Sequence, residues 1–465
     1  MNKLYMGVAA LALCLGFTAC SDDEYGPSYS TATVQNTELK TILAQKGYQF
    51  NADGNLLLDE LANNTTTLDL SGTNISTDAL AELSILPNLT EVDLSDNGYG
   101  PTFDFAKLPE QITGVDLTGN EICDFPGLVN IETQENGDET VTVLHNLTKL
   151  CLPEIAKYNC NEIVAFYQNA SSAEIQMEDA SGNLAKYTTL REVPDEKWRT
   201  LLQKLYPSMF DGEYIDIAKR LVKPNERSQN LTTLDIENKT MTVGNIEGFQ
   251  YIANNKGYNG AMLYMLTDEK CEISYFPIPS SAFSLQLKNI STPNGFDTRN
   301  IENLCYVDMK YNEGLKDFDI SKSTTFGQRG DGGGDNAEFG DYFLLYCCDS
   351  LEEVHFPNNA TTATSITLID CPKLKALELR QFEAASELRL ALLPSVNEIV
   401  HPELKRVYGT SSKKCRFGID EDIYNRQETK DFIQKYYIEN DLIQWNSLPS
   451  GYGVKAYDWT TNYNK

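Results

Sequence analysis

The chain has 465 residues, with 67 acidic and 38 basic side chains, so its formal charge at pH 7 is −29. A net negative charge of this size excludes binding to nucleic-acid phosphates or anionic lipid by overall charge attraction. The hydrophobic fraction of 41% and the charged fraction of 23% are those of a folded protein. The length predicts either several domains or an elongated array.

The N-terminus has the pattern of an export signal. Residues 1–19 carry Lys3 and then an apolar run, and Phe17-Thr18-Ala19 stands directly before Cys20. Small residues before a cysteine resemble the lipobox of bacterial lipoproteins, which implies that Cys20 is lipidated and becomes the mature N-terminus. An ordinary cleaved signal peptide is the alternative.

Residues 20–34 form a predicted acidic tether behind that anchor. Asp22, Asp23 and Glu24 resemble the export signal that surface lipoproteins of the Bacteroidota carry. The resemblance implies an outer-membrane, surface-exposed lipoprotein. Because no other stretch of the sequence approaches a membrane-spanning length, the lipid would be its only membrane anchor.

Residues 35–64 are predicted to cap the N-terminal end of the fold. A helix is expected over Glu38 to Gln45, and the stretch from Gln49 to Glu60 resembles an EF-hand calcium loop. Gln49 stands where such a loop carries its first aspartate, which removes ligand charge, so a cap that holds no calcium is the alternative. The candidate calcium ligands are Asn51, Asp53, Asn55 and Glu60.

Residues 65–152 contain a repeat. The segment LTEVDLSDN at 89–97 has the spacing L-x-x-V-x-L-x-x-N, and the same frame fits 65–73 and 112–120. This resembles the leucine-rich repeat family, in which each repeat supplies one short strand of a parallel sheet. Asn97 and Asn120 are predicted to satisfy backbone groups where the chain leaves the strand. The inward pairs are Leu68 with Leu70, Val92 with Leu94, Val115 with Leu117, and Leu150 with Leu152.

The outward residue between each inward pair is often aspartate. Neighbouring strands lie ~4.8 Å apart, so Asp69, Asp93 and Asp116 are predicted to form a carboxylate column on the concave face, with Asp235 in a later strand. The column is a candidate docking strip for a cation or for a cationic or polyhydroxylated ligand. The alternative is that aspartate is simply common at this position of the repeat and that the carboxylates point apart into water.

Residues 153–230 interrupt the repeat and are predicted to be a helical insertion. After Asp195, the residues Trp198, Leu201, Leu202 and Leu205 follow the spacing of one helix face. That face is expected to pack against the array rather than to form a groove for a partner.

Residues 231–410 form the predicted second repeat block. Segments such as CPKLKALEL resemble the treponemal-type leucine-rich repeats of bacterial surface proteins, and a glycine-rich insertion interrupts them at 327–335. A second set of apolar pairs falls halfway between the first, which predicts strands on both walls. The first set is Leu234 with Ile236, Leu285 with Leu287, Val307 with Met309, Val354 with Phe356, Leu377 with Leu379, and Ile399 with His401; the second is Phe318 with Ile320, Ile366 with Leu368, and Leu388 with Leu390.

Two cysteines occupy equivalent places in consecutive repeats of this block. Cys348 and Cys371 are each three residues before the leucine that opens a repeat. Stacking brings their Cα atoms within the range of a disulfide, but parallel Cβ vectors point side by side. A buried, reduced pair is therefore expected, with a bridge as the alternative.

Residues 411–465 are predicted to be the C-terminal cap, with a helix around Glu428 to Ile438 that carries Phe432, Ile433, Tyr436 and Tyr437 on one side. Farther on, Tyr452, Tyr457, Trp459 and Tyr463 are rings that either meet sugars or pack on the cap.

The predicted fold class is an α/β solenoid of leucine-rich repeats, with parallel strands along a curved array, strands on both walls of the C-terminal half and a helical insertion. No paired acids, activated nucleophile or metal spacing indicates an enzyme. The expected function is non-enzymatic binding of an extracellular protein or polysaccharide through the concave face, without a cofactor unless the N-terminal cap holds calcium. The alternative is a glycan-binding accessory lipoprotein of a nutrient uptake system, which requires exposed aromatic platforms on one face.

Overall fold

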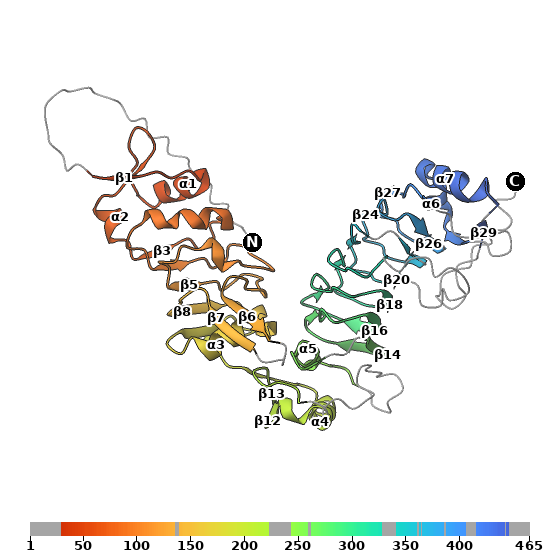
Figure 1. The fold of residues 1–465 in the computed structure, drawn as a ribbon, viewed down its shortest axis with the longest axis horizontal. Helices are drawn as coiled ribbons and strands as arrows, with labels where there is room; N and C mark the ends of the chain where they lie inside the picture. The colour runs from red at the N-terminus through yellow and green to blue at the C-terminus, as the bar shows by residue number, and fades with distance from the viewer. Residues whose placement is uncertain are drawn as a thin grey trace, which may run out of the picture.

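The computed structural model describes residues 29–134, 139–222, 243–258, 262–327, 341–359, 362–363, 365–385, 387–405, 415–441 and 443–445. Within them the chain forms two elongated arms of stacked parallel strands that meet at an angle (Figure 1). The predictions at Cys20, Asp22 to Glu24 and Asp235, the strand at 234–236, most of the glycine-rich insertion and the C-terminal rings lie outside the described residues.

The N-terminal end of the first arm is closed by two helices. Helix α1 (Thr37–Gln45) begins at Asn36, whose side chain accepts a hydrogen bond from the Leu39 N–H, and it buries Leu39 and Leu43. Asp59 caps α2 (Glu60–Asn64) in the same way. Strands β1 (Thr31–Ala32) and β2 (Leu56–Leu57) pair antiparallel beside them.

The first arm is built on a six-stranded sheet with the order β10-β9-β8-β5-β4-β3. In this sheet β3, β4, β5, β8 and β9 run parallel, with Leu68, Val92, Val115 and Leu150 in register. The sheet strands are β3 (Thr67–Asp69), β4 (Glu91–Asp93), β5 (Gly114–Asp116), β8 (Lys149–Leu152), β9 (Glu174–Glu178) and β10 (Leu184–Lys186); the hairpin strands are β6 (Val129–Thr133) and β7 (Glu139–Val143); the helices are η1 (Thr77–Ile85), η2 (Phe105–Lys107), η3 (Glu154–Tyr158) and α3 (Glu162–Asn169).

Asparagines hold the turns of the first arm, as predicted. The Asn97 side-chain amide donates to the carbonyls of Leu70 and Ser95, and that of Asn120 donates to those of Leu94 and Leu117. Both residues are buried, so each amide satisfies backbone carbonyls that water does not reach.

The prediction of a helical insertion at 153–230 is wrong in part. The segment contains α3 and α4, but β9 extends the first sheet in parallel register with β8, and a three-stranded sheet follows. The apolar positions of β9 lack the leucine spacing of the earlier strands, which concealed it. The elements that join the arms are β11 (Leu190–Arg191), α4 (Glu196–Leu205), η4 (Pro207–Met209), β12 (Phe210–Asp211), β13 (Tyr214–Asp216) and α5 (Phe249–Ala253).

Helix α4 packs inward, as predicted. The Asp195 side chain accepts a hydrogen bond from the Trp198 N–H at its start. Trp198 and Leu202 are buried in the core of the second arm, and the Trp198 ring lies edge-on to Phe249 of α5. The apolar face of α4 is therefore part of the core, and this packing removes its apolar surface from water.

The second arm has strands on both walls, which confirms the expectation from the half-spaced pairs. One wall is an eight-stranded sheet in which every pairing is parallel. The wall strands are β14 (Met262–Glu272), β16 (Ser284–Ser291), β18 (Tyr306–Lys310), β20 (Tyr342–Tyr346), β23 (Ser365–Ile369), β26 (Glu387–Ala391), β28 (Cys415–Ile419) and β29 (Ile443–Trp445); the short strands elsewhere are β15 (Phe276–Pro277), β17 (Phe296–Asp297), β19 (Asp317–Asp319), β21 (Glu353–His355), β22 (Thr362–Ala363), β24 (Ala376–Glu378), β25 (Ala384–Ala385) and β27 (Glu398–Val400).

The predicted assignment of strands to walls is wrong beyond residue 310. Val354, Leu377 and Ile399 were expected to continue the row of Leu285 and Val307, but they lie on the opposite wall. The long sheet continues instead through Phe343, Ile366 and Leu388. The glycine-rich insertion before β20 interrupts the repeat spacing. The predicted spacing is therefore displaced by half a repeat beyond the insertion, and it omits β20.

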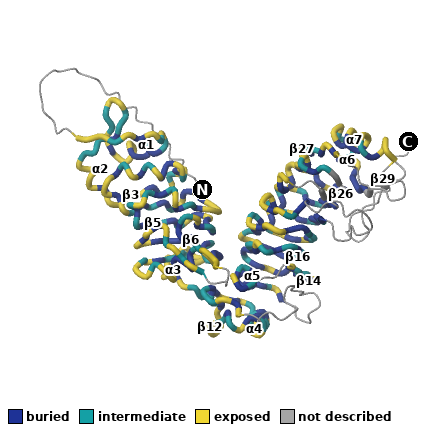
Figure 2. Tube along the Cα trace, viewed as in Figure 1, coloured by how far each residue is buried: buried dark blue, intermediate teal, exposed yellow. Residues whose placement is uncertain are grey.

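Each arm has its own core, and the two cores meet at the junction. Figure 2 shows buried residues along the length of both arms. Cys123 and Tyr158 of the first arm belong to the core of the second. The C-terminal end is closed by α6 (Glu421–Tyr424), α7 (Gln427–Ile433) and a π-helical turn (Gln434–Ile438). Of the predicted face, Phe432, Ile433 and Tyr437 are buried and Tyr436 is half-buried. Among the described residues, no helix is long and apolar enough to cross a membrane.

Candidate functional site

The predicted carboxylate column is present in the first arm, and Oδ1 of each of its side chains is hydrogen-bonded within its own turn. Asp69, Asp93 and Asp116 are in register on adjacent parallel strands. Each carboxylate accepts two hydrogen bonds from the residue two positions on. For Asp93 the donors are the N–H and hydroxyl of Ser95, at 3.0 and 2.7 Å.

The same arrangement occurs at the other two positions of the column. The donors are Ser71 to Asp69 and Thr118 to Asp116, at 2.6 to 3.0 Å. The hydrogen bonds from Ser71 lower the pKa of the Asp69 carboxyl. The aspartates thus close the turns that follow the strands through Oδ1. The docking strip on this face stays a prediction.

The calcium candidates in the N-terminal cap are arranged as a turn. The Asn51 side chain accepts a hydrogen bond from the Asn55 N–H at 2.9 Å, and Asp53 is exposed. Glu60 lies in the first turn of α2. The Lys40 ammonium lies 5.4 Å from the centre of the Phe50 ring, and a Cβ added at Gly54 would come within 2.2 Å of its Nζ. A fixed cation therefore lies at the loop, and it opposes the binding of a second cation.

Cys348 and Cys371 are both free thiols and both fully buried, as expected. They follow the paired strands β20 and β23 at equivalent positions. Hydrogen bonding to the neighbouring Cys348 thiol, together with burial, raises the pKa of Cys371, so the Cys371 thiol stays protonated at neutral pH.

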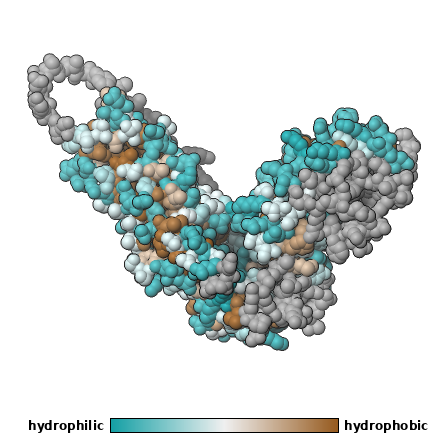
Figure 3. Space-filling view, in the orientation of Figure 1, coloured by the Kyte–Doolittle hydropathy of each residue, from teal (hydrophilic) through white to brown (hydrophobic). Residues whose placement is uncertain are grey.

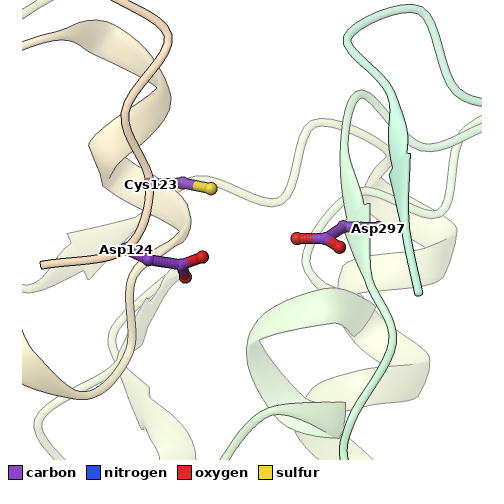
Figure 4. Close-up of side chains that lie close together, drawn as sticks. All are labelled: Cys123, Asp124 and Asp297. Atoms are coloured by element: carbon purple, nitrogen blue, oxygen red, sulfur yellow. The ribbon is translucent and has the colours of Figure 1, made fainter. Parts of the chain in front are cut away.

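The residues that come together across the molecule are at the junction of the arms. Figure 4 shows Cys123 and Asp124 of the first arm pointing toward Asp297 of the second. The Tyr275 hydroxyl lies 3.3 Å from the Cys123 sulfur and donates to Asp297 Oδ2 at 3.0 Å. Arg299 donates through Nε and Nη2 to both oxygens of Asp297, and Nη2 also donates to Asp124 at 3.1 Å. These five residues form one polar network, which we call the junction network.

Burial sets the electrostatics of the junction network. Burial and the nearby Asp124 raise the pKa of Cys123 to about 12, so the thiol is not a nucleophile at neutral pH. Burial raises the pKa of Asp124, although attraction to Arg299 opposes that shift. Burial opposes the charge of Arg299, yet hydrogen bonding and attraction to Asp297 and Asp124 raise the pKa of its guanidinium.

The spacing of Cys123, Asp124 and Asp297 resembles that of metal ligands. One ligand atom from each lies within 4.8 Å of the others. The guanidinium of Arg299 already pairs with both carboxylates in that space. The donor set therefore fits an ion-pair network better than a cation site, because a metal ion would have to displace a fixed positive charge.

A cleft of about 690 Å³ opens above the junction network, and we call it the junction cleft. Figure 3 shows a recess where the arms meet, with hydrophilic residues around it. Both arms and the elements between them contribute to its lining. Its lining includes Asp124, Asn161, Asn254, Tyr258, Arg299 and Asn300.

The glycan alternative requires an aromatic platform. The outward face of the long sheet carries tyrosines that could form one. The rings of Tyr306 and Tyr342 stack on adjacent strands, with centroids 4.9 Å apart. Both are half-buried, and Tyr346 on the same face is buried. Much of this aromatic area is therefore already in contact within the protein.

Sequence reasoning missed the junction site because its residues are scattered between repeats. Asp124 and Arg299 are 175 residues apart, and neither stands in a motif. The signal that could have indicated them is Asp297-Thr298-Arg299, an acid and a base two residues apart after an aromatic strand residue. Comparison of the chain with protein-family models, with curated proteins and with solved structures gives no match, so the assignment of function depends on the residues and their geometry.

Proposed function

We propose that the chain is a leucine-rich repeat solenoid, displayed on the outer membrane as a lipoprotein, that binds an extracellular protein or polysaccharide at the junction of its arms without catalysis. The observation that carries the proposal is the junction cleft. Stacked strands make each arm stiff, and clefts between structural units are where proteins commonly hold ligands.

Features of the first arm support the family assignment. The strands that hold Leu68, Val92 and Val115 are in parallel register, and asparagines close the turns behind them. This is the arrangement that the sequence spacing implies for leucine-rich repeats.

The chemistry of the junction cleft supports binding rather than catalysis. Its thiol, Cys123, is held protonated by burial. Asp124 and Asp297 are both paired with Arg299, so neither is available as an unpaired general base. His145, His355 and His401 all lie elsewhere.

The display part of the proposal is tested in cells by acyl labelling and protease treatment. Cys20→Ala should abolish acyl labelling and release the protein from the outer-membrane fraction. Replacing Asp22, Asp23 and Glu24 by alanine should keep the label but reduce protease accessibility on whole cells. Labelling that persists in Cys20→Ala would refute the lipoprotein assignment, and unchanged accessibility would refute surface export.

The binding part is tested with the full-length protein in detergent against a glycan array and immobilised extracellular-matrix proteins. Binding should be saturable and should be lost in a variant with Arg299→Ala, provided that its unfolding transition shows a folded protein. Asp93→Asn is the control outside the cleft, and it should bind like the wild type. The proposal fails if neither surface binds the protein, or if Arg299→Ala binds with unchanged affinity.

A further inference from the structure

The junction cleft has chemistry that selects among ligands. We infer that it binds a neutral saccharide, with sugar hydroxyls held by the Arg299–Asp124 pair at its floor and by amides at its rim. This inference rests on the proposed function, because it names the ligand class of the same site.

The first observation is the charge of the cleft. Across the chain, acidic residues exceed basic ones by 67 to 38. In the cleft lining, four acids face three bases: the acids are Asp124, Glu162, Asp297 and Glu302, and the bases are Lys256, Arg299 and Lys322. The local field is therefore nearly balanced on a strongly acidic protein. A neutral ligand has no desolvated charge to compensate there, whereas the protein as a whole repels a polyanion.

The second observation is an open donor and an open acceptor on one ion pair. Arg299 uses Nε and Nη2 toward carboxylates, and among the described residues its Nη1 makes no hydrogen bond. Within the described part of the chain, Asp124 accepts only through Oδ2, from Arg299 and Thr102. Nη1 and Oδ1 remain for a ligand, and a hydroxyl, which both donates and accepts, can use either.

The third observation is the rim of neutral amides. Asn161 and Asn300 are exposed, and Asn254 donates through Nδ2 to two backbone carbonyls while its Oδ1 has no partner among the described residues. Amides offer donors and acceptors without charge, which suits hydroxyls rather than phosphate or ammonium groups. The half-buried Tyr258 supplies a ring at the same cleft, and aromatic rings offer apolar area to the flat face of a sugar.

Alternative ligands fit the cleft less well. A metal ion would compete with Arg299 for Asp124 and Asp297. An anion would meet four carboxylates, and a polycation would meet three fixed bases. The volume of about 690 Å³ lies within the range of small-ligand sites.

The test uses the full-length protein in detergent on an array of neutral oligosaccharides, namely glucans, mannans and galactans, with heparin and chitosan as charged controls. The variant is Asn161→Ala with Asn300→Ala, because both side chains are exposed and their loss should leave the fold intact. Its matched control is Asn358→Ala, an exposed asparagine on the second arm outside the junction cleft. Thermal unfolding of each variant checks the fold.

The expected result is binding to at least one neutral class, a tenfold or greater loss of affinity in the double variant, and unchanged affinity in Asn358→Ala. Preference for heparin or chitosan overturns the inference but leaves the proposed function standing. Neutral binding that the double variant retains also overturns it. If the protein binds neither the array nor the immobilised matrix proteins, the inference and the proposed function both fail.

Discussion

At the residue scale, three aspartates of the first arm have a structural role that the sequence pattern does not reveal. In register on parallel strands, Asp69, Asp93 and Asp116 resemble a ligand strip when only the sequence is considered. Each one instead closes a turn through two hydrogen bonds. Local side-chain to backbone bonds of this kind are a common use of aspartate, and strand periodicity alone does not reveal them.

Asp93→Ala should therefore destabilise the protein by about 1 to 2 kcal/mol, because the Ser95 N–H and hydroxyl lose their acceptor. Asp93→Asn keeps an oxygen in place and should cost less than half as much. Glu91→Ala, outward on the same strand, is the control, since its 3.8 Å ion pair with Lys149 contributes little. Denaturant unfolding measures all three. Equal stability of the wild type and Asp93→Ala would show that the turn does not need the carboxylate.

Lys40 provides a second prediction at the residue scale. Its ammonium lies at the calcium-like loop, so adding calcium or removing it with a chelator should leave the unfolding midpoint of the full-length protein unchanged. Lys40→Met serves as the comparison, because it removes the opposing charge. A calcium-dependent rise of the midpoint in the wild type would establish the loop as a binding site after all.

At the scale of elements, a histidine that directly follows β27 joins the second arm to the C-terminal cap. His401 accepts or donates a 2.9 Å hydrogen bond with Thr429 of α7, and its ring stacks on Phe432 with centroids 4.6 Å apart. Burial lowers the pKa of His401 to about 4. The unfolded chain takes up this proton near pH 6.5, whereas the folded chain does so only near pH 4.

Because the unfolded state binds the proton first, stability should fall as the pH drops from about 6.5 to about 4, by up to about 1.4 kcal/mol per pH unit from this group. His401→Gln removes the titration and should flatten that part of the curve. The measurement is urea unfolding of both proteins between pH 7 and pH 4. Carboxylates contribute a background that both share, so parallel curves for the two proteins would disprove the role of His401.

The elements themselves could be predicted to different extents. The leucine spacing and Asn97 placed the strands of the first arm correctly, because a buried inward pair fixes the register of a short strand. The frame failed after residue 310, where an insertion of unpatterned residues breaks the count and β20 follows it. Strand β9 lacks the spacing, and only its pairing with β8 identifies it. Pattern reasoning thus places elements within an unbroken repeat and loses them where the length changes.

At the scale of the whole molecule, the junction network joins the two arms. Arg299 pairs with Asp297 of its own arm and with Asp124 of the other. The candidate site could not be predicted, because it arises from contact between residues far apart in the chain, and one sequence carries no signal of that contact. Repeat spacing describes what happens within an arm and says nothing about where the arms meet.

Arg299→Ala should destabilise the protein by about 2 to 3 kcal/mol, because it leaves Asp297, which is only 8% exposed, without a charge partner. Adding Asp297→Asn should recover part of that loss, and a double-mutant cycle in denaturant measures the coupling. Arg299→Lys keeps the charge but not the bidentate geometry, so its stability should lie between those of the wild type and Arg299→Ala. Purely additive losses would mean that Arg299 and Asp297 are not coupled in the folded protein.

The most direct test of the central claim, that the ligand occupies the junction of the arms, is amide hydrogen exchange on the full-length protein with and without the neutral polysaccharide that binds best on the array. The account predicts slower exchange in segments from both arms that line the cleft, near Asn161, Asn254 and Asn300, and unchanged exchange at β3, β4 and β5. Slower exchange confined to those three strands, or to the outward face of the long sheet, would contradict it.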